Sequence, residues 1–195
     1  MPIVAHDPTV LPPDLPVPLD DGAAGHLLGA AVPDVALPST DGRSIALAGS
    51  GAERTIVYAY PRTGRPGEPP LVADWDRIPG ARGCTPESCG FRDHHDELRA
   101  LGAEVYGLST QTTEDQREVV GRLGLPFPLL ADAELLLTEA LRLPTFQAAG
   151  HTLLKRLTFV VRNGRIEHVW YPVFPPDSHA GQVLAWLGDQ RDGRA

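Results

Sequence analysis

The sequence predicts an α/β fold in which helices flank a central mixed β-sheet. Runs rich in β-branched and aromatic residues alternate with segments of helical period through the middle of the chain, as in sheets that contain parallel strands. Two dipeptides that suit tight reversals, Asp41-Gly42 and Asn163-Gly164, lie between apolar runs and predict antiparallel hairpins. The 20 glycines and 20 prolines in 195 residues predict long loops between these elements.

The first 30 residues differ in composition from the rest. Six prolines precede Leu19, and no steady apolar period runs through the segment. Proline lacks a backbone donor and interrupts helices and central strands. We therefore expect residues 1–30 to form a Pro-rich arm, extended over a surface of the domain or partly disordered, and outside the core. Residues 31–190 are expected to form one domain.

The first elements of the domain follow from local patterns. Alternating apolar positions on both sides of Asp41-Gly42 predict a hairpin that begins near Val32. Residues 55–60 form a β-branched and aromatic run that predicts a buried strand ending at Pro61. Residues 62–83 hold four prolines and four glycines, and they predict a long loop.

A helix is predicted over 86–101. Thr85 and Pro86 are typical of an N-cap and a first helical residue, and Gly102 is typical of a helix end. Strands and helices then alternate. We predict a strand over 104–109, a helix over 114–123, a short strand over 128–130 and a helix over 134–141.

The chain closes with a hairpin and a helix. The hairpin is predicted over 156–161 and 166–171 around Asn163-Gly164, and the helix over 180–187. A βα alternation followed by an antiparallel hairpin and a last helix is the layout of a thioredoxin-like fold.

The charge balance excludes several classes of partner. Asp and Glu number 25 against 17 Lys and Arg, which gives a formal net charge of −8 and argues against binding to nucleic acid or to an anionic membrane. No apolar run approaches the roughly 20 residues that cross a bilayer, and the first residues lack the pattern of a signal peptide. We expect a cytoplasmic protein whose partners are small molecules or other proteins.

Two cysteines lie at the start of the predicted helix. Free backbone N–H groups and the helix dipole favour a thiolate at Cys84. Cys89 follows five residues later, and in an intact helix the two Cα atoms would be roughly 8.5 Å apart, beyond disulfide reach. A pair that joins only after the first turn unwinds fits a redox cycle better than a static crosslink. The spacing also allows both to be small buried apolar side chains.

Three segments in order carry a family resemblance: IVYAYPR at 56–62, GCTPESCGFRD at 83–93 and KRLTFVVRNGRIEHVWYP at 155–172. Together they resemble the peroxiredoxins, in particular the bacterioferritin-comigratory or Q-type group. The resemblance spans roughly residues 32–187.

The resemblance implies a role for each matching residue. Cys84 would attack the peroxide O–O bond and become a sulfenic acid, and Cys89 would resolve it as an intramolecular disulfide. Arg156 would lie beside the thiolate, lower its pKa and orient the peroxide. Pro61 would shield the pocket.

The chain departs from the family just before Cys84. Relatives place a proline seven residues before the cysteine and a Thr or Ser three residues before it, where this chain has Arg77 and Ala81. We interpret 62–83 as an inserted loop that interrupts the motif, so that Thr63 supplies the hydroxyl, with Thr85 as the alternative.

Other chemistry is poorly supported. His94 and His95 follow the cysteines at spacings unlike those of structural zinc sites, and we expect no bound metal. Glu87 is interpreted equally as polar support for the site or as a helix-start acid. No nucleotide-binding motif is present, and no cofactor is expected.

The sequence thus predicts a thiol-dependent peroxidase for hydrogen peroxide and organic hydroperoxides. A thioredoxin-like protein is the expected reductant, and a monomer is expected because the resolving cysteine is local. The alternatives are a redox-responsive binding or sensor protein, in which a disulfide alters a partner surface, and a thiol-disulfide oxidoreductase. A thiol-disulfide oxidoreductase would normally have two residues between its cysteines, whereas this chain has four.

Overall fold

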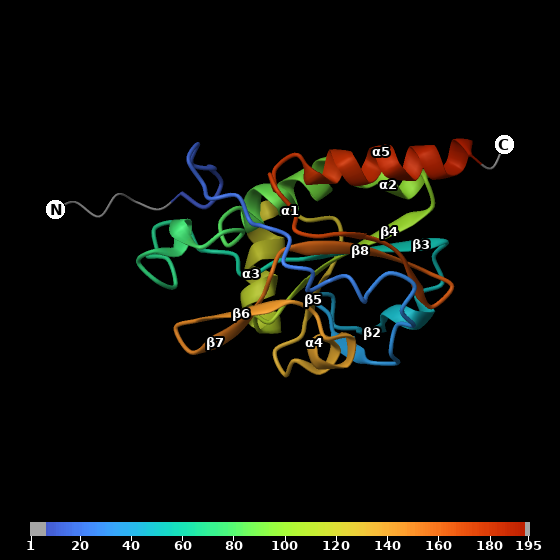
Figure 1. Cartoon of the computed structure of the whole chain (residues 1–195), viewed down its shortest axis with the longest axis horizontal. Helices are drawn as coiled ribbons and strands as arrows, with labels where there is room; N and C mark the ends of the chain where they lie inside the picture. The colour runs from blue at the N-terminus through green and yellow to red at the C-terminus, as the bar shows by residue number, and fades with distance from the viewer. Residues whose placement is uncertain (1–6, 194–195) are drawn as a thin grey trace.

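The computed structural model describes residues 7–193. Its centre is a mixed sheet of five strands in the order β5-β4-β3-β8-β9 (Figure 1). Strands β3, β4 and β5 run parallel, whereas β8 lies antiparallel to both β3 and β9. The predicted thioredoxin-like α/β fold is confirmed. The strands are β3 (Arg54–Ala59), β4 (Ala103–Ser109), β5 (Leu129–Ala131), β8 (Leu157–Arg162) and β9 (Arg165–Trp170).

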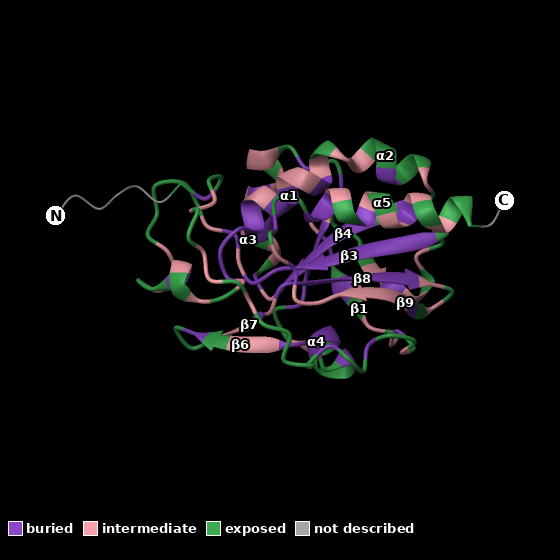
Figure 2. Cartoon of the chain, turned by 45° about the horizontal axis from the view of Figure 1, so that its top comes forward, coloured by how far each residue is buried: buried purple, intermediate pink, exposed green. Residues whose placement is uncertain are grey.

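Two hydrophobic clusters cover the two faces of this sheet, because side chains of a strand alternate between its faces. In β3, Ile56 packs with α1, α2, α3 and α5, and Val57 packs with α4 and the N-terminal hairpin. Figure 2 shows the buried sheet between these layers. The helices are α1 (Cys84–Asp93), α2 (His95–Ala100), α3 (Thr113–Leu123), α4 (Leu136–Leu141) and α5 (His179–Asp192), and the short 3₁₀ helices are η1 (Leu47–Gly49) and η2 (Trp75–Arg77).

Both predicted hairpins are confirmed. β1 (Ala36–Pro38) pairs with β2 (Ser44–Ala46) around Asp41-Gly42. Asn163 and Gly164 join β8 to β9 with φ of 51° and 70°. Positive φ at both turn positions matches the twist of the two strands.

The helix predicted over 86–101 is two helices, and this prediction was wrong at both its start and its middle. The helix begins at Cys84 with Gly83 as N-cap, so Thr85 lies inside the first turn and does not cap it. Gly83 has φ +107°, a backbone conformation that residues with a side chain rarely adopt. His94 leaves helical geometry at φ −97° and ψ 6°, which separates α1 from α2.

One hairpin was missed by the sequence analysis. β6 (Thr145–Ala148) pairs with β7 (His151–Leu154) in a sheet of its own. Its turn places Ala149 at φ 49°. Alanine is uncommon in that conformation, so the sequence lacked the usual turn signal.

The segment expected to form an outlying arm is more integrated than predicted. Between residues 7 and 30 the described chain has turns and no helix or strand. Leu27 is fully buried in the core, however, and the Gly29 N–H donates to the Ile166 carbonyl at 2.8 Å. Apolar burial and pairing to the free edge of β9 hold this segment down.

The loop predicted over 62–83 is a long excursion, interrupted only by η2. Trp75 and Ala81 are buried, and they pack with Ala148 and Leu153 of the β6–β7 hairpin. The missed hairpin therefore supports the loop that precedes Cys84.

Candidate active site

Cys84 is the first residue of α1 and is 3% exposed. It lines a cavity of about 200 Å³. The other walls come from the 62–83 loop, from Gln111 before α3, from α3 itself and from Pro8 of the N-terminal segment. Cys84 is thus buried yet borders a partly open pocket.

Arg156 is the nearest charged partner of this thiol. Its Nη2 lies 3.1 Å from Cys84 Sγ and donates to the carbonyl oxygens of Arg82 at 3.2 Å and Ala81 at 3.3 Å. Nη1 donates to the carboxylate of Glu87, which is fully buried. The fold brings Arg156, which directly precedes β8, onto the first turn of α1 across 72 residues of sequence.

Burial and the neighbouring Arg156 shift the pKa of Cys84 in opposite directions. Burial raises the pKa of the Cys84 thiol, and the charge and hydrogen bond of Arg156 oppose that rise. The Arg62 backbone also lowers this pKa by hydrogen bonding, whereas the charge of Glu87 raises it. The sequence expected a lowered thiol pKa from the helix start, and desolvation is the larger effect.

Glu87 belongs to the site and is not a surface acid at a helix start. Burial raises its pKa to about 7, and Arg156 opposes the rise. The Glu87 carboxylate and the Cys84 thiol therefore share one guanidinium. The sequence allowed both roles for Glu87, polar support for the site or a helix-start acid, because burial cannot be read from its position in the helix.

Cys89 lies on the same helix as Cys84 and is half-buried, and both cysteines are free. The intact helix keeps their Cα atoms roughly 8.5 Å apart, outside the range of a disulfide. A bond between them would require the first turn of α1 to unwind.

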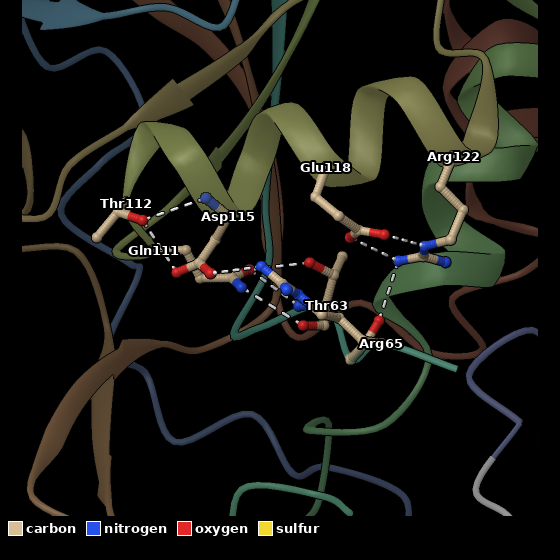
Figure 3. A network of polar contacts seen from close by, with 8 residues as sticks. Thr63, Arg65, Gln111, Thr112, Asp115, Glu118 and Arg122 are labelled. Atoms are coloured by element: carbon tan, nitrogen blue, oxygen red, sulfur yellow. Dashed lines mark hydrogen bonds and ion pairs between the residues drawn. The ribbon is translucent and has the colours of Figure 1, made fainter. Parts of the chain in front are cut away.

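Thr63 lies in the cavity wall, as expected for a residue near Cys84. Its N–H and its hydroxyl both donate to Gln111 Oε1, at 2.9 and 3.0 Å, and Gln111 Nε2 donates back to the Thr63 carbonyl at 3.4 Å (Figure 3). The hydroxyl proton of Thr63 is thus directed at Gln111. Gln111 was missed by the sequence analysis because no motif marks it.

Thr85 presents a second hydroxyl. Its side chain is 2% exposed and lines the same cavity, and its Oγ1 has no hydrogen-bond partner among residues 7–193. Pro61 is buried at the end of β3, but it is not among the residues that line the cavity.

The start of the 62–83 loop is tied to α3, as Figure 3 shows. Arg65 pairs with Asp115 at 3.4 Å. Arg122 donates to the Gly64 carbonyl at 3.0 Å and pairs with Glu118 at 2.7 Å. These contacts fix one wall of the cavity.

The two histidines after the cysteines have contacts of their own. His94 Nδ1 bonds Glu97 at 2.8 Å, and the ring of His95 packs 5.6 Å from that of Phe127. Across residues 7–193, no group of three His, Cys, Asp or Glu side chains is arranged to hold a metal. No helix in the same range is long and apolar enough to span a bilayer.

Known proteins are similar to this chain in sequence and in architecture. The sequence model of the Redoxin family matches residues 27–184. Peroxiredoxin Bcp of Escherichia coli is 30% identical over 163 residues, which cover 82% of this chain and 94% of that protein. Chloroplastic peroxiredoxin Q of Oryza sativa is 31% identical over 160 residues, and the matched region spans 65% of its length.

Solved structures agree with the sequence relatives. Peroxidoxin BcpB from Mycobacterium tuberculosis superposes with a TM-score of 0.67 at 25% identity, over 84% of this chain and 97% of that one. Peroxiredoxin Q from Xanthomonas campestris superposes with a TM-score of 0.65 at 25% identity, over 83% and 94%. The chain therefore belongs to the Redoxin family, among the peroxiredoxins of the Bcp and Q type.

Proposed function

We propose that this protein is a thiol-dependent peroxidase that uses Cys84 as its nucleophile. The Cys84 thiolate attacks one oxygen of a hydroperoxide, the O–O bond breaks, and the leaving oxygen takes a proton to become water or an alcohol. Cys84 is left as a sulfenic acid, oxidised by two electrons.

The observation that carries this proposal is the contact between Arg156 and the buried Cys84 thiol inside a cavity. A fixed cation beside the sulfur stabilises the thiolate and can bind the peroxide oxygens where negative charge develops. We keep Pro61, which is buried two residues after β3, as the residue that shields the site.

Cys89 is the proposed resolving residue. Its thiol attacks the Cys84 sulfenic sulfur, the S–O bond breaks, and water leaves as the disulfide forms. A thioredoxin-like dithiol then reduces the disulfide and is itself oxidised to a disulfide. All residues of the proposed cycle lie in one chain, so we propose that the protein acts as a monomer. We also propose a cytoplasmic location, because thiols stay reduced in that compartment.

The cavity supports organic hydroperoxides as substrates besides hydrogen peroxide. At about 200 Å³ it exceeds the space of about 10–15 Å³ that one water requires. Trp75, Leu71 and Val119 give it an apolar part that could receive an alkyl group.

A hydroxyl in the cavity would donate to the peroxide. Thr63 was the expected donor, and its proton is directed at Gln111. We assign the donor role to Thr85, whose buried hydroxyl is unpartnered within the described chain, and Thr63 and Gln111 form another part of the cavity wall.

The test is the intact mass of the reduced protein after seconds with one equivalent of hydrogen peroxide, followed by thiol trapping and peptide mapping. The expected result is rapid loss of two hydrogens with a Cys84–Cys89 crosslink in the map. An unchanged mass with two alkylatable thiols would overturn the proposal.

A further inference from the structure

The N-terminal strap, defined as residues 7–21, crosses the loop that leads into Cys84. Arg82, which is 8% exposed, donates through Nη2 to the Val10 carbonyl at 2.8 Å and to the Asp7 carbonyl. Arg82 therefore ties the strap to the backbone two residues before Cys84. Figure 1 shows this N-terminal segment, in blue, beside the loop in green.

Apolar contacts continue along the strap. Leu11 Cδ2 lies 3.0 Å from the position that a Cβ on Gly83 would occupy, and Pro18 packs at 3.7 Å from the same position on Gly80. Gly83 is the N-cap of α1, so Leu11 packs, together with Pro176, against the point at which the helix begins.

The far end of the strap is anchored next to Arg156. Asp21 accepts hydrogen bonds from Lys155 Nζ at 2.6 Å and from the Tyr171 hydroxyl at 2.7 Å. Hydrogen bonds from these two groups hold the pKa of Asp21 well below its usual range. The strap is thus fixed at both ends, with the 80–84 segment beneath it.

This strap precedes the part of the chain that matches the Redoxin family, which begins at residue 27. It lies outside the matched region, and it contacts Arg82 and Gly83, which directly precede the turn that must unwind. Cys84 and Cys89 cannot bond while the first turn of α1 is intact. Because Gly83 and Arg82 are joined directly to that turn, we expect its unwinding to disturb their contacts with the strap.

We propose that the N-terminal strap restrains unwinding at Cys84 and thereby slows disulfide formation relative to oxidation of the thiol. This inference rests on the proposed peroxidase cycle and adds a regulatory element to it. A slower disulfide step prolongs the sulfenic acid and exposes it to a second peroxide, which oxidises it to the sulfinic acid. The strap thus sets how much peroxide the enzyme tolerates.

The test compares Leu11→Glu with Val17→Glu in the full chain. Leu11→Glu places a charge against Gly83, whereas Val17 is 60% exposed on the same strap and serves as the matched control. Rapid quenching with thiol alkylation and mass spectrometry separates the second-order oxidation of Cys84 from the first-order formation of the disulfide.

Leu11→Glu is expected to speed disulfide formation by about three- to tenfold over Val17→Glu, the effect of losing a contact of ordinary strength. It should also yield less sulfinic acid at high peroxide. Arg82→Met, which removes the bonds to the Val10 and Asp7 carbonyls, should shift the disulfide step in the same direction.

Equal disulfide rates in Leu11→Glu, Arg82→Met and Val17→Glu would overturn the role of the strap while leaving the peroxidase intact. A wild-type protein that forms no sulfenic acid would instead overturn the proposed function itself. The two failures are distinguished by the first step.

Discussion

The two cysteines of α1 share a helix and differ in nearly every other respect. Cys84 is 3% exposed, faces a cavity and contacts a guanidinium, whereas Cys89 is half-buried further along the helix. Two identical side chains on one helix therefore differ in burial and in their charged neighbours, and these surroundings give them different chemistry. In the proposed cycle the buried thiol beside Arg156 reacts with the peroxide, and Cys89 reaches the oxidised sulfur only after the first turn of α1 unwinds.

The largest expected effect breaks this division directly. Cys84→Ser should abolish peroxide consumption, because serine does not replace the thiolate as nucleophile. Cys89→Ser should complete one turnover and accumulate sulfenic acid, since no second thiol in the chain can resolve it. Peroxide loss and dimedone trapping followed by mass spectrometry measure both. Full activity in Cys84→Ser would reverse the assignment.

Removing the cation should sharpen the contrast between the thiols. Arg156→Met is expected to slow oxidation of Cys84 by about 100-fold, the usual cost of losing a charge-stabilising donor. Breaking its buried pair with Glu87 should also cost about 3–5 kcal/mol of stability. Thermal unfolding checks the fold, and Arg156→Lys, which keeps the charge, should lose less activity. Equal oxidation rates in wild type and a folded Arg156→Met would contradict the role.

The two cavity hydroxyls provide a subtler test. Thr85→Val should slow oxidation of Cys84 by about 10-fold, as expected for one hydrogen bond to a developing charge. Thr85→Ser should restore most of the rate. Alkylation by iodoacetamide, which needs no such donor, should change little. If Thr63→Val caused the greater loss of peroxide rate, the donor would be Thr63 instead.

The smallest expected effect concerns pH. Burial raises the pKa of Cys84, the charge of Glu87 adds to that rise, and burial raises the pKa of Glu87 itself to about 7. The alkylation rate of wild-type Cys84 should therefore keep rising with pH above the ordinary thiol range. Glu87→Gln removes the competing anion, so its alkylation profile should shift to lower pH. A shift to higher pH would show that Glu87 acts mainly by holding Arg156 in place.

Regular elements were predictable where pattern and local chemistry agree. Clear apolar patterns mark strand β3 and helix α3, and turn dipeptides mark both predicted hairpins. The β6–β7 hairpin was not predictable, because Ala149 occupies a turn conformation that alanine seldom adopts. The break between α1 and α2 at His94 has no counterpart in the apolar period, since Phe91 and Leu98 are buried on both sides of it.

The candidate site was predictable only in part. Motif and spacing pointed to Cys84, and the structure places Arg156 against it. Gln111 and the fate of the Thr63 hydroxyl were beyond the sequence, because the contact joins residues 48 positions apart through a loop of irregular backbone. The role of Glu87 depended on burial, which a helical position alone does not give.

By itself, the sequence determined the fold class, the two candidate thiols and the long loop over 62–83, because these depend on residue type, period and spacing. Only the tertiary structure decided that burial raises the pKa of Cys84 against the pull of Arg156, and that the N-terminal strap covers the start of α1. Desolvation and long-range contacts are properties of packed surfaces, and they arise only when distant segments share one interior.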